Sequence, residues 1–140
     1  MTNQERTTEE ILKDHNYIVL TTLRKNGKGV TTPVWFVFAN NKVYFYTFEK
    51  AWKNKRLKKN PTVEFAPANA RMFAPSKYTV IGKTIRGIAR SLAKEEAEEA
   101  DRLLRRKYGF KYWMFNKLQA ASFRGKNIYF EVTPTKVLNE

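Results

Sequence analysis

Cysteine is absent from this chain of 140 residues, and histidine occurs only once, at His15. Without a thiol the protein has no disulfide, no thiolate nucleophile and no cysteine-ligated metal site. The one imidazole follows a short predicted helix near the N-terminus, away from any acid and hydroxyl pattern typical of nucleophilic catalysis. We therefore expect neither Ser-His-Asp catalysis nor a metal site.

Long apolar runs and nucleotide-binding motifs are also missing. No segment approaches the roughly 20 apolar residues of a membrane helix, and the first residues form no apolar signal segment. The sequence thus predicts a cytoplasmic protein with no membrane partner. It contains no GxxxxGK[ST] phosphate loop and no GxGxxG after a strand, and only Glu64 and Glu131 are acids on predicted strands. Acid and base catalysis by side chains is not prominent.

Acidic residues are scarce in the middle of the chain. Between His15 and Lys94 there are sixteen Lys or Arg residues and two acids, Glu49 and Glu64, within a net charge of +14. Five of the thirteen acids instead crowd the first turns of one predicted helix, where they complement the helix dipole: Glu95, Glu96, Glu98, Glu99 and Asp101. The cationic middle stays uncompensated, which favours a polyanionic partner, with phosphate as the first choice.

Six cations fall in one short segment that ends at an Asn-Pro turn: Lys50, Lys53, Lys55, Arg56, Lys58 and Lys59. Residues 51–59 are predicted to be helical, so Lys53 and Arg56, three positions apart, project from one face. An ammonium and a guanidinium there can hold a phosphate together, and the helix start adds free backbone amides. The alternative is a solvated helix face with no ligand.

Length and composition predict one folded unit, residues 1–140. Hydrophobic residues make up 42% and aromatic residues 14%, enough for a core. Alternating patterns predict strands at 17–22, 30–38, 43–48, 62–67, 78–89 and 127–137, and helical spacing predicts helices from Thr7 or Thr8 and at 51–59, 94–108 and 110–121.

Proline and glycine refine this prediction. Pro33 indicates an edge or a bulge, residues 69–77 with Pro75 are predicted to be a loop, and residues 78–89 to be broken at Gly82 or Gly87. The order of elements favours a mainly β fold with α, a closed or nearly closed antiparallel barrel with flanking helices.

Four segments carry a family resemblance: Tyr17-Ile18-Val19-Leu20-Thr21-Thr22, Thr31-Thr32-Pro33-Val34-Trp35-Phe36 after Gly27, Val43-Tyr44-Phe45-Tyr46-Thr47, and Lys53-Asn54-Lys55-Arg56-Leu57-Lys58-Lys59-Asn60-Pro61. In this order the chain resembles the flavin/deazaflavin oxidoreductase superfamily of split β-barrels, the FMN-binding split barrel type. That superfamily includes pyridoxamine 5′-phosphate oxidase, and the closer likeness is to its small members that use coenzyme F-420. The similarity continues through residues 82–90 and 105–109 to 132–134.

The resemblance implies a homodimer with two cofactor sites between the protomers. By motif position Lys53 and Arg56 would bind the cofactor phosphate, with Lys55 as a further candidate. The ring and ribityl chain would lie against two strands, lined by Thr31, Pro33, Val34, Trp35 and Thr47. No catalytic side chain is implied, because the cofactor carries the chemistry.

The implied function is an oxidoreductase that passes hydride from reduced coenzyme F-420 to a conjugated small-molecule acceptor. The phosphodiester and polyglutamate tail of that cofactor would be attracted by lysines 50, 55, 58, 59, 77 and 83. An FMN-dependent oxidoreductase of the same fold is the alternative, as is a flavin or haem carrier. A basic nucleic-acid-binding barrel is a remote third reading, supported by the sequence pI near 10.1.

Several aromatic residues allow two interpretations. Trp35 either packs in the core or forms a wall beside a ring, and Trp52 either packs on a ligand or inserts between protomers. In the homodimer that the resemblance implies, Tyr108, Tyr112, Trp113 and Phe115 either reach the partner's cofactor cleft and shape the substrate pocket or pack a helix on the barrel, and packing is expected for most of them. Arg71 lies where relatives often carry an Arg-Gly pair, but Met72-Phe73 follows it here, which leaves its role toward the cofactor open.

Overall fold

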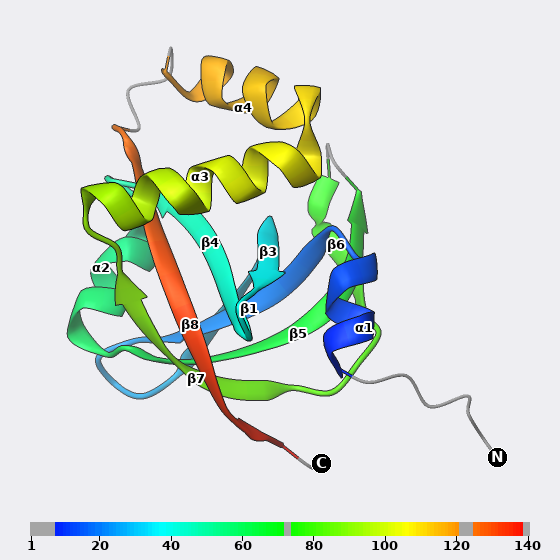
Figure 1. Cartoon of the computed structure of the whole chain (residues 1–140). Helices are drawn as coiled ribbons and strands as arrows, with labels where there is room; N and C mark the ends of the chain where they lie inside the picture. Colours follow the sequence, from blue (N-terminus) through cyan, green and yellow to red (C-terminus); the bar gives the residue numbers. More distant parts are fainter. Residues whose placement is uncertain (1–7, 72–73, 121–124, 139–140) are drawn as a thin grey trace, which may run out of the picture.

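The computed structural model describes residues 8–71, 74–120 and 125–138 (Figure 1). Its strands are β1 (Tyr17–Leu23), β2 (Gly29–Val34), β3 (Phe36–Ala39), β4 (Lys42–Phe48), β5 (Thr62–Arg71), β6 (Ala74–Val80), β7 (Ile85–Ser91) and β8 (Asn127–Val137). Its helices are α1 (Thr8–Asp14), α2 (Trp52–Lys59), α3 (Lys94–Tyr108) and α4 (Phe110–Ala120). None of the helices within these ranges is long and apolar enough to cross a membrane.

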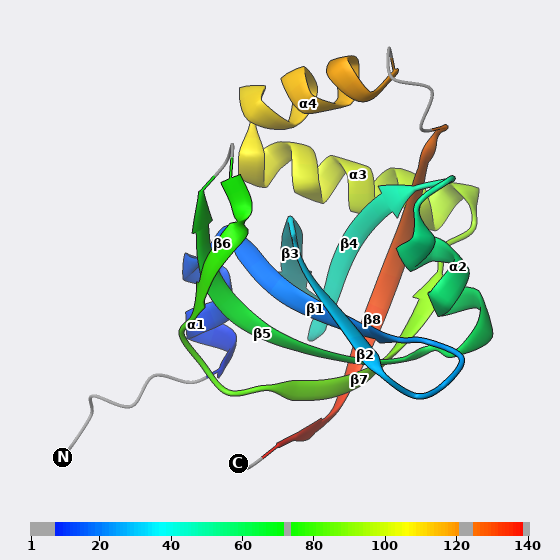
Figure 2. The same cartoon turned by 180° about the vertical axis from the view of Figure 1, so that it is seen from behind.

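The strands form one antiparallel sheet in the order β2-β1-β5-β7-β8-β4-β3, and β6 pairs with β5 outside this order. The sheet curls until its two end strands, β2 and β3, approach one another along the chain, where only Trp35 separates them. Figure 2 shows this curled sheet from the side of β2. Among the described strands no ladder joins β2 to β3, so the barrel is split there, as predicted for a nearly closed barrel.

The inside of the barrel is filled with side chains. Alternate residues of β1, such as Ile18 and Leu20, meet large aromatic residues from other strands, and the rings of Phe45 and Phe130 stack with centroids 5.2 Å apart. Leu57 from α2 joins the same buried cluster. The side chains of this cluster fill the interior, so a ligand would have to bind on the outer surface of the barrel or at its ends.

Two turns follow directly from the sequence. Asn40 and Asn41 join β3 to β4 with φ of 56° and 61°, the left-handed conformation that a two-residue hairpin turn requires. Gly27 has φ of 88° in the turn between β1 and β2, where its N–H donates to the Arg24 carbonyl at 2.8 Å. Both turns lie in the intervals between the predicted strands 17–22, 30–38 and 43–48.

Other segments differ from the prediction. Residues 30–38 form two strands rather than one, because the chain breaks at Trp35, whose side chain packs on α3. The predicted edge at Pro33 is confirmed, since β2 ends the sheet. The predicted loop at residues 69–77 is wrong: outside the undescribed Met72 and Phe73, these residues belong to β5 and β6. Pro75 is tolerated there because β6 pairs only with β5, at a point where the register shifts.

The strand predicted at residues 78–89 is split between β6 and β7, and Gly82 lies in the break, as predicted. A Cβ at Gly82 would lie 2.6 Å from Pro67 Cγ, so the chain passes too close to β5 for a side chain. Gly87 instead lies within β7 at a register shift against β8. The second of the two proposed break points is thus a bulge in a continuous strand.

Two helices cover one side of the barrel as stacked layers, with α3 next to the sheet and α4 outside α3 (Figure 1). Buried Leu104 and Tyr108 of α3 pack with buried Tyr112 of α4. The bounds of α3 and β8 are those predicted, and Gly109 ends α3 with φ of 63°. Helix α4 runs to Ala120, whereas residue 121 of the predicted helix lies outside the described residues.

Candidate functional site

Helix α2 closes one end of the barrel and presents its cations around that end. Its buried side, made by Asn54 and Leu57, faces the sheet, and Asn54 Nδ2 donates to the Glu49 carbonyl at 3.0 Å. Ala51 precedes the helix with no side-chain cap, so the amides of the first turn have no side-chain acceptor from that residue. A free helix start and the positive end of its dipole favour an anion at this point.

Arg56 is fixed in place by β1. Its Nε donates to Thr22 Oγ1 at 2.6 Å, and Thr22 is fully buried near the end of that strand. Burial lowers the pKa of Arg56, and the nearby charge of Arg24 lowers it further. No acid among the described residues forms an ion pair with Arg56.

Lys53 lies beside Arg56 on the same side of α2. Its side chain is half-buried, and burial, followed by repulsion from Arg56, lowers its pKa to about 8. No ion pair with an acid within the described ranges relieves this repulsion. Two neighbouring, partly desolvated cations without a counter-ion form a site that an anion would stabilise.

A cleft of about 780 Å³ lies between α2 and the turn that joins β1 to β2. It is lined by Leu23, Arg24, Lys25, Trp52, Lys55, Arg56, Lys58, Lys59 and Asn60, which include six cations and no acid. Trp52 has 71% of its surface exposed, and the Lys55 ammonium lies 4.4 Å from the centroid of its ring. The cleft thus combines concentrated positive charge with an exposed aromatic face.

The predicted ring-binding residues lie outside the walls of this cleft. Thr31 is exposed on β2, where its Oγ1 lies 2.7 Å from Thr21 Oγ1, and Pro33 is half-buried opposite Val19. Val34 faces the other way and is buried in the barrel core. As the edge strand, β2 has backbone groups on one side that no neighbouring strand of the sheet binds.

Trp35 and Thr47 are both engaged with the protein itself. The Trp35 ring stacks on Tyr108 with centroids 4.7 Å apart and planes 13° apart, and meets Phe115 edge-on at 4.9 Å. Thr47 is 4% exposed near the end of β4, opposite Ile128 of β8. The packing interpretation of Trp35 accounts for one face of its ring, and its role beside a cofactor stays a prediction.

The aromatic residues at the α3–α4 junction are mostly structural. Tyr112 and Tyr129 donate their hydroxyls to Asp101 Oδ1 at 2.6 and 2.7 Å, and Arg105 donates to Oδ2 at 2.8 Å. Burial alone would raise the pKa of Asp101, but these three donors outweigh it, and the pKa is lowered. The expectation that most residues from Tyr108 to Phe115 pack the helices therefore agrees with these contacts. Arg71 is the last residue of β5, and its side chain is not among those that the structure describes.

The sequence did not predict one wall of the cleft or the hydrogen bond that holds Arg56 in place. Arg24 and Lys25 come from the turn between β1 and β2, and Thr22 from the strand before it. The turn itself is legible in the sequence, but its position opposite α2 depends on how the sheet curls. The repeated Lys and Arg around Gly27 are the signal that could have drawn attention to it.

Comparisons with known proteins identify the family and the fold. The family model described as pyridoxamine 5′-phosphate oxidase matches residues 5–139. A search of curated proteins found no match. Among solved structures, 94 chains match.

Three of these structures show the variety of proteins with this fold. The heme storage protein HutZ of Vibrio cholerae is 16% identical, with 91% of this chain and 87% of that chain covered and a TM-score of 0.67. An F420 reductase is 17% identical, with 97% and 99% covered and a TM-score of 0.63. An FAD-binding protein of Mesorhizobium loti is 12% identical, with 98% and 92% covered and a TM-score of 0.63. At these identities the likeness concerns the fold, a split β-barrel. Because the family model matches nearly the whole of this chain, the chain belongs to the pyridoxamine 5′-phosphate oxidase family.

Proposed function

We propose that this protein is an oxidoreductase that binds coenzyme F-420 and places the phosphate of that cofactor on Lys53 and Arg56. The observation that carries the proposal is the pair of partly desolvated cations without an acidic partner in the described residues, beside the free start of α2. The residues present fit a phosphate, because the charge of a bound anion would offset both the repulsion between the two cations and the cost of their desolvation.

The surplus of charge favours the deazaflavin over FMN. The phosphate of FMN needs two or three cations, whereas the cleft beside the Lys53 and Arg56 pair adds Arg24, Lys25 and Lys55, with Lys58 and Lys59 beyond them. A cofactor that carries further negative charges beyond its phosphate would use this cleft. FMN remains the alternative cofactor within the same proposal.

The ring of the cofactor would lie on the outside of the barrel along β2. The barrel core leaves no space for it, and Thr31 and Pro33 face outward on this edge strand. Unpaired backbone groups of β2 would provide hydrogen bonds to the ring heteroatoms. A second protomer would cover the ring from its other side, as the family resemblance implies for a homodimer.

The protein's own contribution to the reaction would be binding and orientation. When bound, reduced coenzyme F-420 supplies a hydride to an acceptor. The cleft lining holds no carboxylate and no histidine, so positioning of the acceptor against the ring and exclusion of water would provide the rate. Lys53 and Arg56 would fix the cofactor at its phosphate end, and the packed β2 edge would fix the ring.

Single-stranded nucleic acid is the second candidate ligand, because one observation favours it. Trp52 is largely exposed beside Lys55 at the mouth of an acid-free cleft. Such a pair can stack a base and neutralise its phosphate. Binding of this kind would weaken steeply with salt and would be indifferent to flavins.

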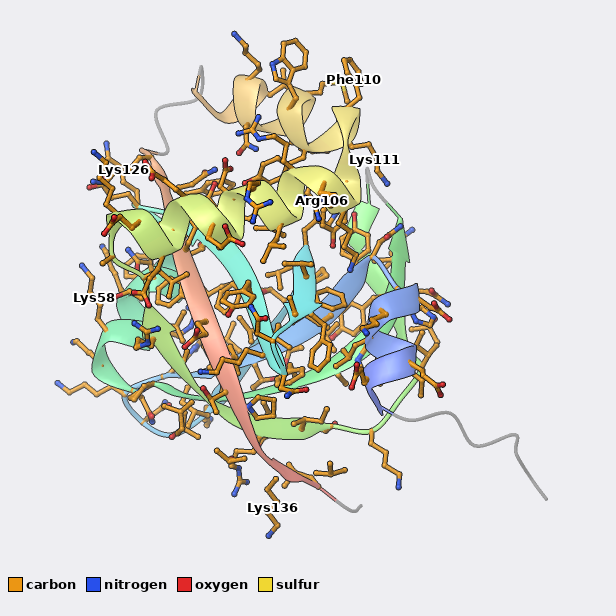
Figure 3. The ribbon with its side chains drawn as sticks, in the orientation of Figure 1. Lys58, Arg106, Phe110, Lys111, Lys126 and Lys136 are labelled. Atoms are coloured by element: carbon orange, nitrogen blue, oxygen red, sulfur yellow. The ribbon has the colours of Figure 1, made fainter. Side chains whose placement is uncertain are left out.

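Substitution of the two cations tests the placement of the phosphate. Each of Lys53→Ala and Arg56→Ala removes a charge-assisted contact, so we expect cofactor binding to weaken by about ten- to a hundredfold, equivalent to about 1.5–3 kcal/mol. Lys136→Ala is the matched control, because Lys136 is exposed near the end of β8, away from Lys58 of α2 (Figure 3), and does not line the cleft. Unchanged cofactor affinity in both cleft-side variants would refute the placement, provided that circular dichroism shows a native fold.

A further inference from the structure

The outer face of α4 is apolar and has no partner among the described residues. Helix α4 lies outside α3 and forms the surface of the molecule at the end farthest from β7 (Figures 1 and 2). Its inner side is occupied by Tyr112, which is fully buried against α3. On the outer side, Phe110 is 70% exposed, Trp113 48% and Leu118 62%. Three large apolar side chains on one short helix exceed what scattered surface residues explain.

Two of these side chains contact one another, and a lysine lies beside one of them. The rings of Phe110 and Trp113 have centroids 5.4 Å apart, and the Lys117 ammonium lies 5.6 Å from the centroid of the Trp113 ring. Spacings of three, four and eight residues along α4 place Phe110, Trp113, Lys117 and Leu118 on one side of the helix. We call this group the α4 patch.

Helix α4 and the residues that flank it in sequence carry cations and no acid. Between residues 102 and 130 there is no Asp or Glu, and there are eight cations: Arg102, Arg105, Arg106, Lys107, Lys111, Lys117, Arg124 and Lys126. Figure 3 shows Arg106, Lys111 and Lys126 at the same end of the molecule as Phe110, whereas Lys136 lies at the other end. Asp101 lies near Trp113 and Lys117 and pairs with Arg105, and Glu99 pairs with Arg102, so the patch is an apolar surface with a net excess of positive charge around it.

This combination matches the surface of an anionic lipid bilayer. Trp, Phe and Leu side chains on a helix that lies flat enter the boundary between head groups and acyl chains, and long lysine side chains reach the lipid phosphates. Each Lys or Arg close to an anionic leaflet adds to the attraction. We propose that the α4 patch binds anionic phospholipid membranes peripherally, with α4 parallel to the surface.

Two other occupants fit the patch less well. A two-fold contact between α4 of two copies would bring Lys111 and Lys117 close to their own counterparts, and α4 carries no acid to pair with them. A nucleic acid would neutralise the lysines but would leave Phe110 and Leu118 in water. The earlier expectation of no membrane partner came from the lack of a spanning segment, which does not bear on an 11-residue helix lying on the surface.

Vesicle sedimentation tests the proposal. We expect the protein to bind vesicles of phosphatidylglycerol and phosphatidylcholine at least tenfold more tightly than vesicles of phosphatidylcholine alone. The double variant Phe110→Ser and Leu118→Ser should lose at least tenfold in affinity for the anionic vesicles. The control double variant Ile88→Ser and Val137→Ser, whose side chains are each 43% exposed on the sheet, should retain it.

Charge and fluorescence provide two independent checks. Lys111→Glu should weaken binding severalfold, whereas Lys136→Glu at the far end should have no effect. Lipids brominated on their acyl chains should quench tryptophan emission in wild-type protein and in Trp52→Phe, but not in Trp113→Phe. All these side chains are exposed except that of Lys111, which is half-buried, so the other variants should keep the thermal unfolding of the wild type, and that of Lys111→Glu is measured alongside its vesicle binding.

Three outcomes would overturn the proposal. The first is equal vesicle binding by the wild type and the Phe110 and Leu118 double variant. The second is quenching that persists in Trp113→Phe. The third is a change of oligomeric state in the double variant, measured by light scattering, with vesicle binding unchanged, which would assign the α4 patch to a second copy of the chain.

Discussion

Lys53 should make anion binding depend on pH in the alkaline range. Its pKa in the folded protein is lowered to about 8, first by burial and then by Arg56. The Lys53 side chain is therefore protonated in about nine-tenths of the molecules at pH 7 and in about one-tenth at pH 9. A phosphate bound beside it raises that pKa, so binding of the phosphate takes up a proton above pH 8.

The size of the effect follows from this linkage. Affinity for a phosphate-bearing cofactor should be flat from pH 7 to about 8 and then fall by up to tenfold per pH unit, until the pKa of the complex is reached. A phosphate monoester such as FMN does not add to this slope, because its second pKa is about 6. We thus expect a loss of about tenfold between pH 7 and pH 9, about fivefold of it between pH 8 and pH 9.

Stability of the ligand-free protein should change in the opposite direction. Because the pKa of Lys53 is lowered, the folded state binds fewer protons than the unfolded state between pH 8 and the ordinary pKa of 10.5. The cost of burying this cation is therefore fully present below pH 8. It is relieved as the pH rises through that window, so the contribution of Lys53 to stability increases while the affinity for an anion decreases.

Titrations with FMN and with coenzyme F-420 at intervals from pH 7 to pH 9.5, followed by ligand fluorescence, measure the slope. Lys53→Arg should bind with little pH dependence, because a guanidinium stays charged. Lys107→Arg is the matched control: burial lowers the pKa of Lys107 to about 8 as well, but its ammonium donates to the His15 and Phe36 carbonyls. A slope that survives in Lys53→Arg, or a flat wild-type profile, would refute the reasoning.

Three further predictions concern stability and are measured by urea unfolding. Tyr108→Phe should lose about 1–3 kcal/mol, because the buried Phe36 N–H, 2.9 Å from the hydroxyl, is left without its acceptor; no loss would contradict the role of this hydroxyl. Gly87→Ala should lower the free energy of unfolding by about 1–3 kcal/mol, since the new Cβ would lie 2.6 Å from Val132 Cγ1. Unchanged stability in this variant would contradict the prediction and show that β7 can move away from β8. Asp101→Asn should lower the free energy of unfolding by about 1–2 kcal/mol at pH 7. Because the pKa of Asp101 is lowered in the folded protein, its stabilising effect requires the ionised carboxylate, so the difference from the wild type should narrow as the pH falls below 4. A difference independent of pH would contradict this.

Local patterns account for most of the fold that was predictable. The alternation of apolar residues in β4 and β8, the Asn40-Asn41 turn and the spacing of Ala100, Leu104 and Tyr108 in α3 are each contained in a few neighbouring residues. Patterns of this kind are decided by side-chain periodicity and by backbone preference.

The errors arise where a distant contact decides the local structure. The break at Trp35 depends on a stacking partner 73 positions later, at Tyr108, and the extension of β5 depends on its pairing with β6. Pro75 led to the prediction of a loop. That β6 pairs with β5 alone, and so can include a proline, depends on the arrangement of the whole sheet.

The candidate site shows the same division. The helix that carries Lys53 and Arg56 and the excess of charge around it are legible in the sequence. The bond from Arg56 to Thr22 and the opposite wall at Arg24 are not, because they join segments about thirty residues apart through the curl of the sheet. The direction in which Val34 points, into the core, also follows only from the register of β2 on β1.

The most direct test of the proposed function is a binding titration of purified, cofactor-stripped protein with coenzyme F-420 and separately with FMN. Ligand fluorescence at two salt concentrations would give the affinity and its dependence on charge. We expect tight binding of coenzyme F-420, selective over FMN and weakened by salt. A preference for FMN would contradict the deazaflavin assignment, and binding of neither ligand would contradict the proposal that this family member is a flavin or deazaflavin oxidoreductase.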